Sequence, residues 1–160
     1  MERELRRNQN IMIIFGTGVI AFGVWSILKA GFYFLLSRDE FMRMLELSPL
    51  EEDRYYIAYA GIVGFLLLDL VVRLYVGLSA RAEGKGKKKG LFYVILCGFH
   101  TMSAIVLLVS SIVESVVSRE SILDMVVALV VELTSLLTMV GLIRACLQTK
   151  KLSRQLSESE

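Results

Sequence analysis

Four long apolar blocks, separated by short charged segments, constrain this chain more than any other feature of its sequence. They cover residues 11–36, 55–78, 91–113 and 122–147. A helix of about 20 residues crosses a bilayer core roughly 30 Å thick, so each block is long enough to span it. Backbone groups in lipid must be hydrogen-bonded within the chain, and the blocks are continuous rather than alternating, so helices are predicted. We expect an all-α integral membrane protein, a four-transmembrane-helix bundle forming one membrane domain over residues 1–160.

The composition agrees with this segregation. Hydrophobic residues make up 55% of the chain, yet 21% of the residues are charged, so the apolar residues must be gathered into blocks. The net charge of +2 is too small to indicate a nucleic-acid-binding protein. The first block follows Arg3, Arg6 and Arg7, as in a secretory signal. It is longer than the apolar core of about 7–15 residues of such signals, and three more blocks follow, which favours a retained signal-anchor helix.

The junctions between blocks carry helix-start signals. Residues 48–51 read Ser-Pro-Leu-Glu, a capping box with Pro at the first helical position, which predicts that the second helix begins before its apolar block. Ser121 and Asp124 repeat this pattern before the fourth block, so Asp124 is interpreted as a helix cap rather than a site. Residues 37–47 have apolar side chains at helical spacing among charged ones. They fit a short amphipathic helix on the membrane surface, and an ordinary polar loop equally well.

Basic residues are sorted between alternate segments. Twelve of the 18 Lys and Arg residues lie in the N-terminal tail, the second loop and the C-terminal end. They are Arg3, Arg6, Arg7, Arg81, Lys85, Lys87, Lys88, Lys89, Arg144, Lys150, Lys151 and Arg154. Only Arg38, Arg43, Arg54 and Arg119 lie in the first and third loops. The positive-inside rule predicts that both termini and the second loop are cytoplasmic, in a multi-pass protein of the plasma (inner) membrane.

The second loop, residues 79–90, is rich in Gly and Lys, and residues 148–160 form a polar C-terminal tail. The loop is expected to be flexible and solvated. Its basic residues are candidates for contact with anionic lipid headgroups: Arg81, Lys85, Lys87, Lys88 and Lys89. The same charges are needed for orientation in any case, so a role in topology alone is the simpler interpretation.

The sequence contains no catalytic motif. Cys97 and Cys146 form no C-x-x-C pair, and His100 is the only histidine, so no metal cluster is predicted. No Gly-rich phosphate loop, nucleophile elbow or H-E-x-x-H is present. We expect no cofactor and no enzyme activity. Ser and Thr residues within the blocks are expected to form hydrogen bonds between helices.

Five ionisable residues within the blocks are the candidates for a functional site, because charged groups in a membrane span are costly. This candidate intramembrane polar network is Lys29, Asp69, Arg73, His100 and Glu132. The two positive and two negative charges suit structural pairs, Asp69 with Arg73 at i,i+4 and Glu132 with Lys29. If Lys29 instead extends to the interface, Glu132 has no charged partner, which is the arrangement used by a proton-coupled carrier.

Two further patterns concern helix packing. Gly16, Gly23 and Ala30 recur every seven residues, which predicts close approach of another helix. Cys97, His100, Ser103 and Ser110 follow helical spacing and predict a polar seam on the third helix.

These features favour an accessory or scaffold subunit that acts through interactions in the membrane, with the lipid bilayer, another membrane protein or a second copy of the chain as its partner. The alternative is a small oligomeric transporter or channel that uses Glu132, Asp69 and Arg73.

Overall fold

The computed structural model describes residues 2–36, 52–118 and 122–158, and its regular structure there is entirely helical. The four helices are α1 (Glu2–Leu36), α3 (Glu52–Gly84), α4 (Phe92–Ser118) and α5 (Ile122–Glu158). Each contains a stretch long and apolar enough to cross a membrane. These stretches are Glu2–Lys29, Tyr59–Gly84, Phe92–Ser110 and Leu129–Leu156. The predicted helical class and the four apolar helices are therefore confirmed.

The helices extend beyond the predicted spans at one end of the bundle. α1 begins at Glu2 instead of residue 11, α3 continues to Gly84 instead of residue 78, and α5 continues to Glu158 instead of residue 147. Much of the predicted second loop and C-terminal tail is thus helical. These polar extensions continue the faces that pack inside the bundle, since Glu83 and Thr149 are both buried. The predicted amphipathic helix at 37–47 and the capping boxes at Ser48 and Ser121 lie outside the described residues.

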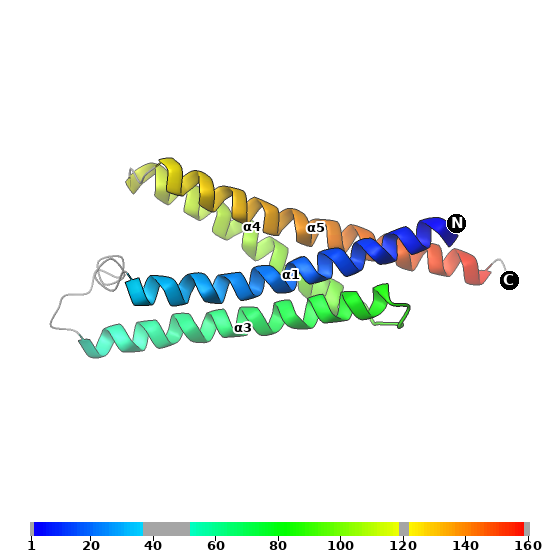
Figure 1. Ribbon diagram of the computed structural model, residues 1–160, viewed down its shortest axis with the longest axis horizontal. Helices are drawn as coiled ribbons and strands as arrows, with labels where there is room; N and C mark the ends of the chain where they lie inside the picture. Colours follow the sequence, from blue (N-terminus) through cyan, green and yellow to red (C-terminus); the bar gives the residue numbers. More distant parts are fainter. Residues whose placement is uncertain (1, 37–51, 119–121, 159–160) are drawn as a thin grey trace.

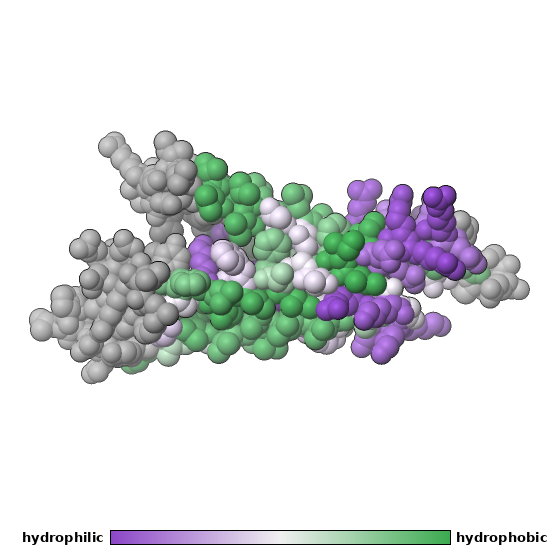
Figure 2. All heavy atoms as spheres, in the orientation of Figure 1, coloured by the Kyte–Doolittle hydropathy of each residue, from purple (hydrophilic) through white to green (hydrophobic). Residues whose placement is uncertain are grey.

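Both termini and the α3–α4 connection lie at the same end of the bundle, which we call the terminal end (Figure 1). Hydrophilic side chains gather there, whereas the surface beyond it is mainly apolar (Figure 2). The segments that carry most of the basic residues therefore share one end of the molecule.

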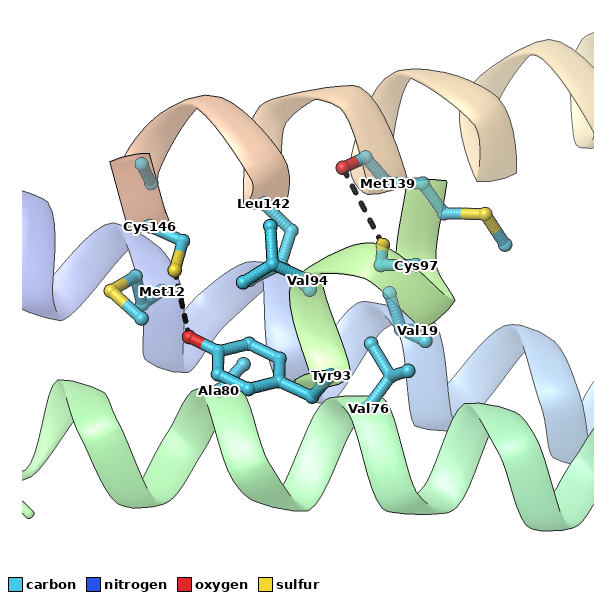
Figure 3. Packing of buried hydrophobic residues seen from close by; sticks show 11 residues of the cluster. Met12, Val19, Val76, Ala80, Tyr93, Val94, Cys97, Met139, Leu142 and Cys146 are labelled. Carbon is cyan, nitrogen blue, oxygen red and sulfur yellow. Dashed lines mark hydrogen bonds between the residues drawn. The ribbon is translucent and has the colours of Figure 1, made fainter. Parts of the chain in front are cut away.

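Among the side chains that the structure describes, the hydrophobic core lies in the half of the bundle nearest the terminal end. It is a cluster of 11 buried residues, drawn in Figure 3. They are Met12, Val19, Val76, Ala80, Tyr93, Val94, Cys97, Met139, Leu142, Ala145 and Cys146. Towards the other end, α4 and α5 diverge from α1 and α3 (Figure 1). Large apolar side chains outside the core are exposed, such as Phe65 at 64% and Phe99 at 71%.

Glycines set the close contact between α1 and α3. A Cβ atom on Gly77 would lie 2.5 Å from the carbonyl oxygen of Gly16, and one on Gly16 would lie 2.8 Å from that of Gly77. Gly23 faces the side chain of Arg73 in the same way, since an added Cβ would be 3.0 Å from Arg73 Cδ. Small residues at such positions let two backbones approach closely. The approach predicted from the spacing of Gly16 and Gly23 is therefore confirmed, and α3 is the partner helix.

We predict that Gly77→Ala destabilises the bundle, because the new methyl group would meet the rigid backbone of α1. Overpacking of this kind typically costs about 1–3 kcal/mol. Thermal unfolding in a mild detergent measures the effect as a lower Tm. Gly64→Ala in the same helix is the control, since nothing lies within 4 Å of its added Cβ. Equal Tm values for the two variants would contradict the close approach.

Candidate functional site

Three of the five predicted network residues lie together in a charged cluster, which we define as Asp69, Arg73, His100 and Ser135. Arg73 Nε donates to Asp69 Oδ2 at 2.8 Å, so the predicted i,i+4 pair is confirmed. His100 Nδ1 lies 3.3 Å from the other oxygen, Asp69 Oδ1. Arg73 also donates from its terminal guanidinium nitrogen to Ser135 Oγ at 3.3 Å. The cluster therefore links α3 to α4 and α5, and both carboxylate oxygens of Asp69 face a nitrogen.

The space beside the charged cluster is closed. The gap is lined by Arg73 and His100 together with apolar side chains such as Val19 and Met139, and it has no room for a water molecule. The Asp69, Arg73 and His100 side chains are only 12–17% exposed. His100 Nε2 is buried and has no hydrogen-bond partner among the described residues. An ion pair in such surroundings is stabilising only when its partners stay in place, because removing one strands a buried charge.

The second predicted pair is not formed. In the described part of the chain, no ion pair joins Lys29 to Glu132. Lys29 is exposed near the end of α1 farthest from the termini, and Glu132 is half-buried on α5. The two helices have diverged at that level, so the pairing suggested by charge balance fails for geometric reasons (Figure 1).

A second polar group lies near the terminal end, and we call it the tyrosine cluster: Tyr93, Glu83, Cys146 and Lys150. Tyr93 Oη donates to Glu83 Oε2 at 2.6 Å and lies 2.8 Å from Cys146 Sγ (Figure 3). Lys150 Nζ is 3.1 Å from Glu83 Oε1 and donates to the Lys89 carbonyl oxygen at 2.8 Å. It also stands 5.9 Å from the centroid of the Tyr93 ring, within the range of a cation–π contact. The cluster joins α3, α4 and α5 where the spans end.

The tyrosine cluster was not predicted from the sequence. Glu83 and Lys150 fall outside the apolar blocks, so they were assigned to a loop and a tail. The spacing of Val76, Ala80 and Glu83 did contain the signal, because i, i+4 and i+7 lie on one face of a helix. Extending that face past the apolar block would have identified Glu83 as a buried residue.

The hydroxyl groups behave differently from the prediction. Ser135 accepts a hydrogen bond from another helix, whereas Thr17, Ser26, Thr101, Thr134 and Thr138 each donate to the carbonyl four residues earlier in their own helix. Such back-bonding satisfies a hydroxyl without a neighbouring helix. The predicted polar seam on α4 is also only partly interior. Ser103 and Ser110 are exposed, and the buried face instead carries Val94, Cys97 and Thr101.

The predicted lipid-contact residues separate into two groups. Lys87, Lys88 and Lys89 line an open cavity of about 400 Å³ at the terminal end, together with Thr149, Lys150 and Arg154 of α5. Arg81 is half-buried and packs beside Gly16 of α1, because a Cβ there would lie 3.2 Å from Arg81 Cγ. Lys85 is exposed and does not line the cavity.

Both cysteines are free thiols buried in the core, Cys97 with its sulfur 4.0 Å from the Met139 carbonyl oxygen. Across residues 2–36, 52–118 and 122–158, no three His, Cys, Asp or Glu side chains gather where they could hold a metal ion. Comparisons of the chain with protein-family models, curated proteins and solved structures find no match.

We predict that Asp69→Asn destabilises the protein, because it leaves the Arg73 guanidinium without a counter-charge in a nearly dry site. The expected loss is about 1–3 kcal/mol, read as a lower Tm in detergent. The double variant Asp69→Asn/Arg73→Met should recover much of the loss, since it strands no charge. Glu132→Gln is the control and should leave Tm almost unchanged. A double variant less stable than the single one would show that the pair does not act as a unit.

Proposed function

We propose that the chain is a multi-pass protein of the plasma membrane that has both termini in the cytoplasm and acts through interactions, as an accessory or scaffold subunit. Four apolar helices support the membrane location. The cytoplasmic side is assigned by the excess of Lys and Arg in the segments that meet at the terminal end. Catalysis is not part of the proposal, since the sequence carries no catalytic motif.

The observation that carries the scaffold proposal is the lack of room for water beside the charged cluster. A carboxylate that carries a proton or an ion across the membrane must exchange with water or substrate. Both oxygens of Asp69 instead face Arg73 and His100, and the neighbouring space is too small for water. These charges therefore serve to fix three helices relative to one another.

The diverging half of the bundle supplies the surface for interaction. It exposes large apolar side chains such as Phe65, and there the α4/α5 pair has separated from the α1/α3 pair (Figure 1). In a bilayer such a surface is covered by lipid tails or by helices of another protein, and apolar packing with either is compatible with its composition. A partner helix would gain additional contacts by lying against two diverging helix pairs at once.

A small oligomeric transporter or channel is the second candidate. It is favoured by His100 Nε2, which has no hydrogen-bond partner within the described residues, and by Glu132, an ionisable residue that is half-buried on α5. In an assembly of several copies, such groups could face a shared polar pathway together with Asp69 and Arg73. Within the described part of a single copy, the space beside Arg73 and His100 has no room for water.

The orientation is tested by cysteine labelling in intact cells. An impermeant thiol reagent added outside should label Glu51→Cys but not Lys85→Cys, because the first loop is predicted to be external and the second loop cytoplasmic. The parental protein, whose two cysteines are buried, gives the background. Labelling of Lys85→Cys alone would reverse the orientation.

The scaffold proposal is tested by photo-crosslinking from the exposed apolar surface. A photoreactive phenylalanine analogue in place of Phe65 or Phe99 should give at least one discrete protein adduct in cells. The same analogue in place of the buried Tyr93 is the control and should give none. Lipid adducts alone at both exposed positions would contradict a stable protein partner.

Proteoliposomes separate the scaffold from the transporter. The scaffold proposal predicts that the protein adds no proton flux to vesicles under an imposed pH gradient, and that Glu132→Gln changes nothing. A flux that disappears in Glu132→Gln, while Tm stays unchanged, would replace the scaffold by the transporter.

A further inference from the structure

The open cavity at the terminal end has the composition of an anion-binding site. Five of its lining side chains are basic and one is acidic. The basic residues are Lys87, Lys88, Lys89, Lys150 and Arg154, and the acidic one is Glu83. They come from the end of α3, the α3–α4 connection and α5, and Leu5 and Gln9 of α1 complete the wall. The cavity therefore exists only when three parts of the chain far apart in sequence are folded together.

Glu83, the acidic residue that lines the cavity, does not pair with the three lysines that would bind an anion. Both carboxylate oxygens of Glu83 are engaged, Oε2 by the Tyr93 hydroxyl at 2.6 Å and Oε1 by Lys150 at 3.1 Å. By contrast, the ammonium groups of Lys87, Lys88 and Lys89 are exposed and have no side-chain partner among the described residues. Three positive charges at the mouth of one cavity repel each other unless an anion lies between them.

An unpaired buried hydroxyl is a second, independent observation that favours a bound ligand. Thr149 is only 5% exposed and lines the cavity, yet its Oγ1 has no hydrogen-bond partner within the described chain. Buried polar side-chain atoms are nearly always hydrogen-bonded, and leaving one unpaired is costly. Thr149 lines the cavity, so rotation about its χ1 torsion would turn this buried hydroxyl towards an anionic oxygen that enters between the lysines.

The backbone holds the basic residues at the cavity. Gly86, which has a φ of 86°, lies just beyond the end of α3. Its N–H donates to the Glu83 carbonyl oxygen at 2.9 Å, and the Lys87 N–H donates to the Ala82 carbonyl oxygen at 3.0 Å. These two bonds form a Schellman motif, which reverses the chain sharply after a helix. Lys150 Nζ then fixes the far side of the connection through the Lys89 carbonyl oxygen. The lysines are thus carried on a defined turn that is tied to α5.

We propose that this cavity binds a phosphate group carried by a small molecule, with Lys87, Lys88 and Lys89 supplying charge and Thr149 Oγ1 donating a hydrogen bond. A volume of about 400 Å³ falls within the range of roughly 300–1,000 Å³ typical of small-molecule pockets, which fits a headgroup or a phosphorylated metabolite better than a bare ion. The cavity adjoins the ends of the apolar stretches, so a phospholipid headgroup and a soluble phosphate ester can both reach it. The proposal holds for a scaffold and for a transporter alike.

The test compares lipids and a soluble analogue on the full-length protein in a neutral detergent. Native mass spectrometry measures the apparent Kd for phosphatidic acid, phosphatidylglycerol and phosphatidylcholine of equal chain length, and calorimetry measures that for glycerol 3-phosphate. Phosphatidic acid carries the most accessible phosphate charge, and we expect it to bind at least about tenfold more tightly than the zwitterionic lipid, at about fivefold per basic residue engaged.

Matched variants distinguish the cavity from general surface attraction. Lys87→Gln/Lys88→Gln should weaken phosphatidic acid binding by more than about tenfold. Lys85→Gln/Lys151→Gln removes the same charge from exposed positions outside the cavity and should change it less than about twofold, because exposed charges beyond the site are screened. Thr149→Val should weaken binding by about tenfold, the loss expected for one hydrogen bond to a charged group, while Thr149→Ser keeps it. Equal weakening by the two lysine pairs overturns the proposal.

The same measurements show whether the phosphate belongs to a lipid headgroup or to a soluble phosphate ester. Binding of phosphatidic acid without glycerol 3-phosphate assigns the site to a lipid headgroup, and comparable binding of both assigns it to a soluble phosphate ester. Either result supports the cavity, provided that the Lys87→Gln/Lys88→Gln dependence is present. If neither compound binds, the proposal is overturned. Because Lys87 and Lys88 are exposed, their variants test the proposal without altering the core.

Discussion

The close contact between Gly16 of α1 and Gly77 of α3 determines how these two helices lie against each other, and other contacts in the bundle depend on it. Because neither residue has a side chain, the two backbones meet directly, and this brings Gly23 against Arg73 and Gly84 against the backbone of Gln9. The first of these contacts leaves the guanidinium room to turn back towards Asp69. The second sets the level of the α3 terminus, where the turn at Gly86 begins. A larger residue at the crossing would therefore disturb both polar regions, although it touches neither.

The two polar clusters both pair ionisable groups that lie away from water, at different levels of the bundle. Ionisable groups away from water must be paired, and their remaining donors and acceptors must be used. In the charged cluster, Asp69 faces nitrogens from its own helix and from α4. In the tyrosine cluster, Glu83 is engaged from α4 and α5. The Glu83 carboxylate thus joins three helices directly. The Asp69 carboxylate joins α3 to α4, and α5 is reached through the Arg73–Ser135 hydrogen bond. Hydrogen bonds between transmembrane helices are individually weak, averaging about 0.6 kcal/mol, so their value here is in fixing which helices meet and at what register.

Much of the architecture could be predicted because it depends on patterns local in sequence. Apolar blocks of sufficient length specify four helices, the i,i+4 spacing specifies the Asp69–Arg73 pair, and the heptad spacing of Gly16 and Gly23 specifies a close contact. The prediction of the Lys29–Glu132 pair failed because it depends on where the helices diverge in space. Lys29 and Glu132 balance in charge, but no pattern along the chain reveals that α1 and α5 have separated at their level. The tyrosine cluster and the cavity were missed because hydropathy ends a span at its first charged residues. A helix can continue past them, and Glu83 and Lys150 are charged residues that the fold buries or pairs.

The unequal packing of the two halves of the bundle connects these findings to function. Near the terminal end the helices share a core, leave no room for water beside Arg73 and form an open basic cavity. Beyond it the same helices have little contact across the bundle and expose apolar side chains. A half that is sealed by paired charges resists rearrangement, since moving one partner would strand the other. A ligand held between the α3–α4 connection and α5 would further stabilise the sealed half, because it would cross-link the helix pairs from which the open half extends. Occupancy of the basic cavity and the spacing of the diverging helices would then be coupled through the rigid core.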